Sequence, residues 1–114
     1  MSLPLRQIAP DFFVAPQLGP AHMALAAEMG FKTVLNNRPD HEHGPGQPTN
    51  AEVEAAALAA GLSYHFLPTD GSASNPAHIA ALAALLPSLQ GPVLAFCRSG
   101  NRSAGLYLRA TQQV

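Results

Sequence analysis

The segment Val93–Ser103, with sequence VLAFCRSGNRS, holds the residues of this chain that are best suited to chemistry. It contains the only cysteine, Cys97, followed by Arg98 and Arg102. A thiolate is the nucleophile of acyl, phosphoryl and sulfane-sulfur transfer, and neighbouring arginines lower the pKa of a thiol. A guanidinium fork also binds two oxygens of an oxyanion, which a lysine cannot do. These residue types predict a nucleophilic Cys97 beside an oxyanion site closed by Arg102.

The elements around the cysteine favour the same interpretation. The apolar run Val93–Phe96 predicts a buried strand that delivers Cys97 to its carboxyl end, where open α/β sheets bind ligands. The loop then leads into a helix from Ser103 to about Gln112, whose N-terminus attracts an anion and favours a thiolate. The alternative is a buried structural cysteine with solvated arginines. We expect the bound anion to contact the loop residues Arg98, Ser99, Gly100, Asn101 and Ser103.

This loop resembles the signature loops of two enzyme classes. Both the cysteine-dependent phosphatases and the rhodanese sulfurtransferases place a Cys-loop-Arg unit at a turn from strand to helix. The phosphatase signature has five residues between the cysteine and the arginine, whereas here four residues, 98–101, separate them. Four is the spacing common in single-domain rhodaneses, and it gives a smaller anion cradle. The loop alone therefore leaves both enzyme classes open.

Other segments extend the resemblance over most of the chain, from about Ile8 to Thr111. The sequences VLNNRPD (34–40), GQP (46–48) and CRSGNRS (97–103), with a strand at 62–67, are similar to the small bacterial beta-lactamase-hydrolase-like phosphatase family. This resemblance implies a fold like that of the dual-specificity phosphatases. Members of the family are also labelled sulfurtransferases, so the resemblance identifies a family more firmly than a substrate.

The resemblance also directs attention to a general acid. Phosphatases of this fold type take that acid from the loop after an earlier strand, which here is the segment 66–72, FLPTDGS. Asp70 is its only carboxylate, and a positioned aspartate that protonates the leaving oxygen contributes about 10²–10⁴-fold to rate. The alternative is that Asp70 simply forms an Asp-Gly turn with Gly71. Sulfur transfer needs no such acid.

The polar stretch 37–48 holds further candidates. Arg38 and Asp40 can form an ion pair that orders this loop, or Arg38 can help to bind an anionic substrate. The sequence His41-Glu-His43 suggests a metal site, but it lies in a loop rich in glycine and proline. No third ligand follows it at a defined spacing. We therefore predict no metal and no cofactor.

The elements that must position these residues alternate along the chain. Glycine, proline and capping residues separate the apolar segments into short blocks. Such alternation indicates right-handed βαβ units and an α/β fold with a mostly parallel sheet flanked by helices. We expect one phosphatase-like domain over residues 1–114. The predicted strands are 12–15, 32–36, 62–67 and 93–96, and the predicted helices are 20–29, 51–60, 76–86 and 103–112.

Composition limits the partners. The 114 residues are 47% hydrophobic, enough for a core without disulfides. Six Lys+Arg against seven Asp+Glu give a nearly balanced charge. This balance argues against a groove that binds nucleic acid and against a patch that binds an anionic membrane. The longest apolar run, 79–86, is far shorter than the ~20 residues of a membrane span. With no secretory signal and one unpaired cysteine, we expect a cytoplasmic protein.

These observations give a leading function and two alternatives. The leading prediction is a phosphatase-like hydrolase that acts on a small anionic substrate through a phosphocysteine at Cys97, with Arg102 holding the oxygens and Asp70 protonating the leaving group. The first alternative is a rhodanese-type sulfurtransferase that carries a persulfide on Cys97. The second is a module that binds an anion or sulfane sulfur without turnover beside a partner enzyme. The oligomeric state is not predicted.

Overall fold

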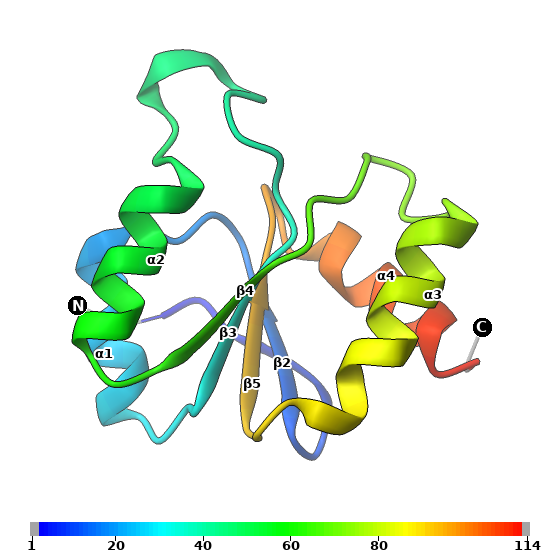
Figure 1. Ribbon diagram of the computed structural model, residues 1–114, viewed down its shortest axis with the longest axis horizontal. Helices are drawn as coiled ribbons and strands as arrows, with labels where there is room; N and C mark the ends of the chain where they lie inside the picture. The colour runs from blue at the N-terminus through cyan, green and yellow to red at the C-terminus, as the bar shows by residue number, and fades with distance from the viewer. Residues whose placement is uncertain (1–2, 113–114) are drawn as a thin grey trace.

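The computed structural model describes residues 3–112, and its centre is a five-stranded sheet (Figure 1). The strand order is β1-β2-β5-β3-β4, in which only the β1–β2 pair is antiparallel. This architecture confirms the predicted α/β class with its mostly parallel sheet. The strands are β1 (Arg6–Ala9), β2 (Phe12–Ala15), β3 (Thr33–Asn36), β4 (Ser63–Phe66) and β5 (Val93–Phe96).

The helices form two layers, one on each face of the sheet. In Figure 1, α1 and α2 lie on one side of the strands and α3 and α4 on the other. Three short 3₁₀ turns, 20–22, 44–46 and 86–88, extend the connections. The helices are α1 (Met23–Glu28), α2 (Asn50–Ala59), α3 (Pro76–Leu85) and α4 (Asn101–Ala110).

Most predicted elements are confirmed, and the differences at their ends have local causes. Thr49 caps α2, because its side chain accepts the Glu52 N–H and the Glu52 carboxylate accepts the Thr49 N–H. The predicted helix 20–29 begins instead as a 3₁₀ turn, where His22 Nδ1 accepts the Gly19 N–H at 2.9 Å. Helix α4 starts at Asn101, two residues before the predicted Ser103.

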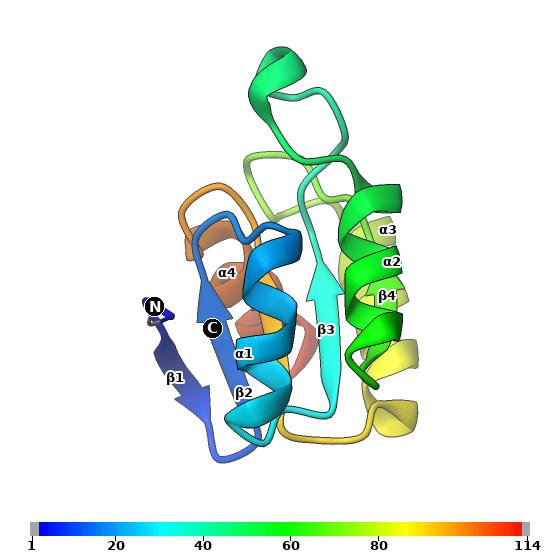
Figure 2. The same ribbon diagram turned by 90° about the vertical axis from the view of Figure 1, so that its left-hand side faces the viewer.

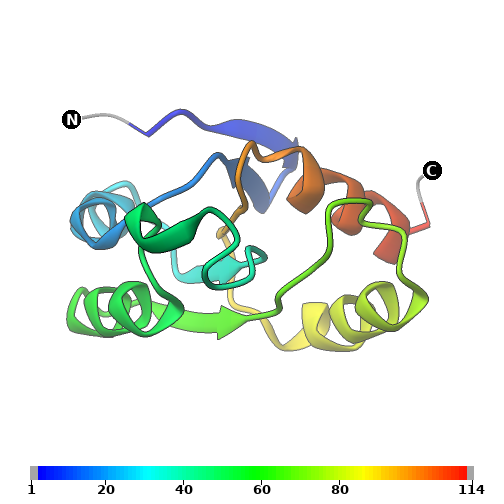
Figure 3. The same cartoon turned by 90° about the horizontal axis from the view of Figure 1, so that it is seen from above.

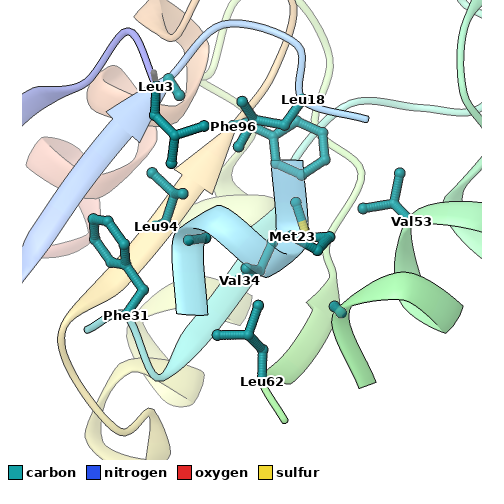
Figure 4. Packing of buried hydrophobic residues seen from close by; sticks show 12 residues of the cluster. Leu3, Leu18, Met23, Phe31, Val34, Val53, Leu62, Leu94 and Phe96 are labelled. Carbon is teal, nitrogen blue, oxygen red and sulfur yellow. The ribbon is translucent and has the colours of Figure 1, made fainter. Parts of the chain in front are cut away.

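Strand β5 shows why the core divides in two. Its four buried side chains alternate between the faces of the sheet, as strand geometry requires. Leu94 and Phe96 belong to the core beneath α1 and α2, which Figure 4 shows around Met23 and Val53. Val93 and Ala95 belong to a second core beneath α3 and α4. The prediction of a buried strand at 93–96 is therefore confirmed.

Parallel strands bring four connecting loops to one edge of the sheet. The loops 16–19, 37–49, 67–75 and 97–100 follow the carboxyl ends of β2, β3, β4 and β5. Figure 2 shows the 37–49 loop rising furthest above this edge, and Figure 3, seen from above, shows it lying between the two helix layers. The candidate residues from distant parts of the sequence are therefore neighbours in space. Among the helices of residues 3–112, none has the length and apolar character needed to cross a membrane.

Candidate active site

Cys97 is a free, fully buried cysteine directly after the central strand β5. Its backbone N–H donates to the carbonyl oxygen of Ala15, at 3.4 Å. Three residues later the chain turns back, and the Gly100 N–H donates to Cys97 Sγ at 3.1 Å. Helix α4 then begins at Asn101. The sulfur therefore lies inside a ring of backbone donors at a helix N-terminus, as the sequence predicted.

This loop favours the thiolate. Burial of the Cys97 thiol acts to raise its pKa, because the low-polarity interior disfavours charge. Hydrogen bonds outweigh that effect and hold the pKa of Cys97 below its ordinary value. The donors are the Ser103 N–H and hydroxyl and the N–H groups of Ser99 and Gly100. Hydrogen bonds, rather than the charges of Arg98 and Arg102 that we expected to activate the thiol, are the main cause of the lowered pKa.

Gly100 gives the loop its shape. Its φ of 92° lies in the region that glycine adopts freely, and it serves as the N-cap residue of α4. A Cβ atom at this position would lie 3.3 Å from both the carbonyl carbon and oxygen of Ala15. The loop is therefore pressed against the end of β2, and this position requires glycine for two independent reasons.

Ser103 and Asn37 join the cysteine loop to its neighbours. Both residues are buried, and Ser103 Oγ donates to Asn37 Oδ1 at 2.8 Å. Asn37 Nδ2 in turn donates to the carbonyl oxygen of Leu67 at 3.0 Å. A hydroxyl has a single hydrogen, so Ser103 stabilises the Cys97 thiolate with its hydroxyl only when this hydrogen turns from Asn37 to the sulfur. Its backbone N–H is free of that competition.

Arg102 makes three hydrogen bonds in the structure. Its Nη1 and Nη2 donate to Oε2 and Oε1 of Glu42, at 3.0 and 3.2 Å. Nη1 also donates to the carbonyl oxygen of Thr69 at 3.2 Å. The arginine that closes the predicted motif is thus held by a carboxylate 60 residues away and by the loop after β4. Sequence analysis did not identify Glu42 as a site residue.

Arg38 contacts the same carboxylate as Arg102. Its Nε donates to Glu42 Oε1 at 2.9 Å, and its Nη1 donates to Gln17 Oε1 at 2.8 Å. The predicted ion pair between Arg38 and Asp40 is wrong, because Asp40 Oδ1 instead accepts the N–H of Asn50 at the start of α2. Glu42, four residues from Arg38, reaches the guanidinium, whereas the nearer Asp40 binds the first N–H of helix α2.

The remaining loop residues are more exposed than the cysteine. The Arg98 side chain is exposed and makes no hydrogen bond or ion pair within residues 3–112, while its carbonyl oxygen accepts the Gln17 N–H. Ser99 Oγ accepts the Asn101 N–H, and Asn101 Oδ1 accepts from Arg6 Nη2 at 3.0 Å. Arg98 is therefore free to meet an anion, whereas the Asn101 side chain is turned toward strand β1.

Asp70 is exposed and bonded to its own loop. Its Oδ1 accepts from the Ser72 hydroxyl at 2.7 Å and from the Ser72 N–H at 3.3 Å. The hydrogen bond from the Ser72 side chain holds the pKa of Asp70 below its ordinary value. The Asp-Gly turn is thus formed. The neighbouring Thr69 brings this loop to Arg102, which places Asp70 at the correct edge of the sheet but in its ionised form.

The surface beside the cysteine loop carries a pocket of roughly 190 Å³. It borders Ser99 and Gly100 on the side of β1 and β2, and neither Cys97 nor Arg102 lines it. The pocket is therefore separate from the buried thiol. Within residues 3–112, no three His, Cys, Asp or Glu side chains gather to form a metal site, and His41 and His43 are both exposed.

Comparison with known proteins gives one family. Residues 4–113 match the model of the family described as "Beta-lactamase hydrolase-like protein, phosphatase-like domain". A curated Beta-lactamase hydrolase-like protein of Agrobacterium fabrum is 43% identical over 79 residues, which are 69% of this chain. The match spans 18% of that relative's length, so the relative is a much longer protein.

Solved structures agree with this assignment. A Neisseria meningitidis protein assigned as a phosphatase superposes with a TM-score of 0.79 and 28% identity, over 89% of this chain and 71% of its own. P. aeruginosa TpbA, crystallised as a cysteine-to-serine variant with phosphotyrosine, gives 0.62 and 21%, over 87% and 56%. A mouse protein assigned as a dual-specificity phosphatase gives 0.53 and 19%, over 95% and 65%. The predicted phosphatase fold is therefore confirmed.

Proposed function

The chain belongs to the family of beta-lactamase hydrolase-like proteins, as their phosphatase-like domain, and from that premise we propose that it hydrolyses phosphate monoesters through Cys97. One observation carries the proposal. The fully buried thiol of Cys97 has a lowered pKa because it accepts backbone hydrogen bonds at the start of α4. A thiolate with converging N–H donors has the composition needed to attack the phosphorus of a dianionic ester.

In the first chemical step the Cys97 thiolate attacks phosphorus and the ester P–O bond breaks. A phosphocysteine forms, and the departing alkoxide takes a proton from an acid. Negative charge on the phosphoryl oxygens is stabilised by the N–H groups of residues 98–102 and by the Arg102 guanidinium. We assign the acid to Asp70, which must first release Ser72 and bind a proton. The low pKa of Asp70 makes that form scarce, so good leaving groups suit this site best.

In the second step a water molecule attacks the phosphorus of the phosphocysteine. The S–P bond breaks, the Cys97 thiolate is restored, and inorganic phosphate leaves. The proton lost by the water passes to the Asp70 carboxylate, which returns it to the state needed for the next turnover. No oxidant, metal or cofactor enters the balance of either step.

The proposed substrate is a small phosphate monoester. The phosphotyrosine complex of TpbA supports an aryl phosphate as the first substrate to test, because that protein shares the fold. Arg98 is exposed beside the thiol and is assigned to the anionic substrate, together with Ser99 and Gly100. We further propose that residues 1–114 act as one phosphatase-like domain. A single free thiol persists in a reducing compartment, so we place this domain in the cytoplasm.

Sulfur transfer is a second candidate, and one observation favours it. Asp70 is ionised and bonded to Ser72, yet transfer of a persulfide sulfur from Cys97 to a thiol needs no proton for an alkoxide. The cradle of four residues between Cys97 and Arg102 is also the spacing common in single-domain rhodaneses.

One assay panel separates the candidates. Wild-type protein and Cys97→Ser are incubated with p-nitrophenyl phosphate and, separately, with thiosulfate and cyanide. We expect release of nitrophenol by the wild type and none above background by Cys97→Ser. Thiocyanate formation without phosphate release would replace phosphatase with sulfurtransferase activity. If neither substrate turns over but phosphate protects Cys97 from iodoacetamide, the domain binds anions without catalysis.

A further inference from the structure

Within residues 3–112, Glu42 is the one carboxylate that forms an ion pair with both Arg38 and Arg102. Its Oε1 accepts from Arg38 Nε at 2.9 Å and from Arg102 Nη2 at 3.2 Å, while its Oε2 accepts from Arg102 Nη1 at 3.0 Å. The side chain is 29% exposed, against 6% for Arg38 and 11% for Arg102. Two guanidinium cations share one carboxylate, so this cluster keeps one net positive charge for an anion.

The way in which Arg102 is bound leaves one of its edges available. A guanidinium has five N–H donors in a fixed plane, and Glu42 and Thr69 accept three of those belonging to Arg102. Glu42 occupies the edge formed by Nη1 and Nη2, and Thr69 takes the remaining Nη1 donor. Within residues 3–112 the Nε–H of Arg102 has no acceptor. It lies parallel to the second Nη2–H, and together they form a two-donor edge that matches two oxygens of a tetrahedral oxyanion.

We propose that Glu42 is a positioning residue that holds Arg102 by its outer edge, so that the Nε/Nη2 edge is presented to the oxyanion bound at Cys97. The long arginine side chain would otherwise sample many rotamers and lose that rotamer entropy when the anion binds. Glu42 already orders the Arg102 side chain in the free protein, so this entropy is not lost when the anion binds. This inference rests on the proposed function, since it concerns the oxyanion of the same reaction.

The opposite arrangement is a plug, in which the Glu42 carboxylate takes the place of the substrate anion and must leave before turnover. The bonding pattern favours positioning, because Glu42 uses only one edge of Arg102 and Arg38 also holds the Glu42 carboxylate, by a hydrogen bond to Oε1. The pKa of Glu42 supports a permanent charge. Burial acts to raise it, but hydrogen bonds from Arg102 and Arg38 hold it below its ordinary value. Glu42 therefore remains ionised throughout the neutral range.

Glu42→Gln tests the inference, because the amide keeps the shape and loses the charge and one acceptor. The matched control is Glu28→Gln, an exposed carboxylate on α1. Phosphate affinity is measured from the protection of Cys97 against iodoacetamide, and kcat and KM from p-nitrophenyl phosphate. We expect about tenfold weaker protection and a lower kcat in Glu42→Gln, partial recovery in Glu42→Asp, and no change in Glu28→Gln. A plug gives the opposite sign, with tighter protection and lower KM, and overturns the proposal, as does an unchanged Glu42→Gln.

A structural readout keeps this test separate from the proposed function. The Nε–H resonance of Arg102, assigned in ¹⁵N-labelled protein by its loss in Arg102→Lys, reports how firmly the guanidinium is held. We expect it to be sharp in the wild type and broadened in Glu42→Gln, at temperatures where both remain folded by thermal melting. Equal sharpness in both proteins overturns the positioning role even if phosphate is hydrolysed. Absence of phosphate protection and turnover in the wild type rejects the proposed function, and the resonance then decides the role of Glu42 alone.

Discussion

The cysteine loop (97–100) and the β3–α2 loop (37–49) meet at the same edge of the sheet but are built differently. The cysteine loop is closed by its own backbone, since the Gly100 N–H bonds Cys97 Sγ three residues earlier. The β3–α2 loop is tied to the site by side chains that reach 60 and 66 residues along the chain, from Glu42 to Arg102 and from Asn37 to Ser103. The cysteine loop therefore depends on local backbone geometry, whereas the β3–α2 loop depends on side-chain pairs between residues far apart in the sequence.

This difference suggests a division of labour. The cysteine loop creates the nucleophile, because backbone N–H groups and Ser103 lower the pKa of Cys97. Within residues 3–112 the β3–α2 loop donates no hydrogen bond to that thiol, and it instead fixes Arg38 and Arg102, the cations that an anion would meet. Substitutions in the cysteine loop should therefore change thiol reactivity. Substitutions that disturb the arginines should change anion binding and leave the thiol as it is.

The largest expected effect comes from the arginine at which the two loops meet. Arg102→Lys replaces a planar fork with a point charge that cannot bind two oxygens at once. We expect kcat/KM for p-nitrophenyl phosphate to fall by about 10²–10³, the usual loss for one oxyanion donor. Arg98→Lys is the comparison, and because this exposed side chain makes no hydrogen bond or ion pair within residues 3–112 we expect a loss of less than about tenfold. Equal losses would show that both arginines act only as a diffuse positive field.

The next effect tests the local geometry of the cysteine loop. In Gly100→Ala a Cβ is forced to a φ of 92° and to 3.3 Å from the Ala15 backbone, which should cost about 1–3 kcal/mol of folding free energy. Gly46→Ala in the β3–α2 loop is the control, since no atom lies within 4 Å of its added Cβ and its φ is not positive. Urea unfolding and alkylation rates at pH 7 measure both properties. A Gly100→Ala protein as stable and as reactive as Gly46→Ala would disprove the strain argument.

The contrast between the loops also explains what the sequence could predict. The order strand, cysteine, glycine, arginine and helix is local, so the position of Cys97 at the end of β5 could be predicted from the run 93–103. The short apolar strands β2 and β3 were predicted for the same reason. Strand β1 was missed, because its sequence RQIA is half polar and its two leading residues are exposed at the edge of the sheet.

Glu42 could not be predicted, because nothing in its local sequence distinguishes it. It stands between His41 and His43, a pattern that suggested only a weak metal motif. Its partner Arg102 reaches it through the stacking of parallel strands at one sheet edge, which is a property of the whole fold. That Arg38 pairs with Glu42 and not with Asp40 depends likewise on where α2 begins, since the N–H of its first residue, Asn50, donates to the Asp40 carboxylate.

A smaller effect separates the contributions of the Ser103 backbone and side chain to the pKa of Cys97. Ser103→Ala removes the hydroxyl donor but keeps the N–H, so the pKa of Cys97 should rise from its lowered value and the thiolate fraction at low pH should fall. In the wild type the alkylation rate should reach half its maximum below pH about 8.5 and fall as pH decreases through that midpoint. Ser99→Ala should shift the midpoint less, because Ser99 acts on Cys97 through its backbone N–H. Identical midpoints in all three proteins would contradict the role of the hydroxyl.

The smallest expected effect concerns Asp70, which neither loop contains. A general acid matters in proportion to the basicity of the leaving group, because a good leaving group departs unprotonated. The pKa of Asp70 is lowered by its bond to Ser72, so protonated Asp70 is scarce at neutral pH and becomes more abundant as pH falls. In Asp70→Asn we expect about a twofold loss with p-nitrophenyl phosphate and roughly tenfold with phenyl phosphate, whose phenolate leaves less readily. The loss with phenyl phosphate should grow as pH falls, because more of the wild-type Asp70 is then protonated. Equal losses with both esters, or none, together with rapid thiosulfate turnover, would remove Asp70 from the mechanism and favour sulfur transfer at Cys97.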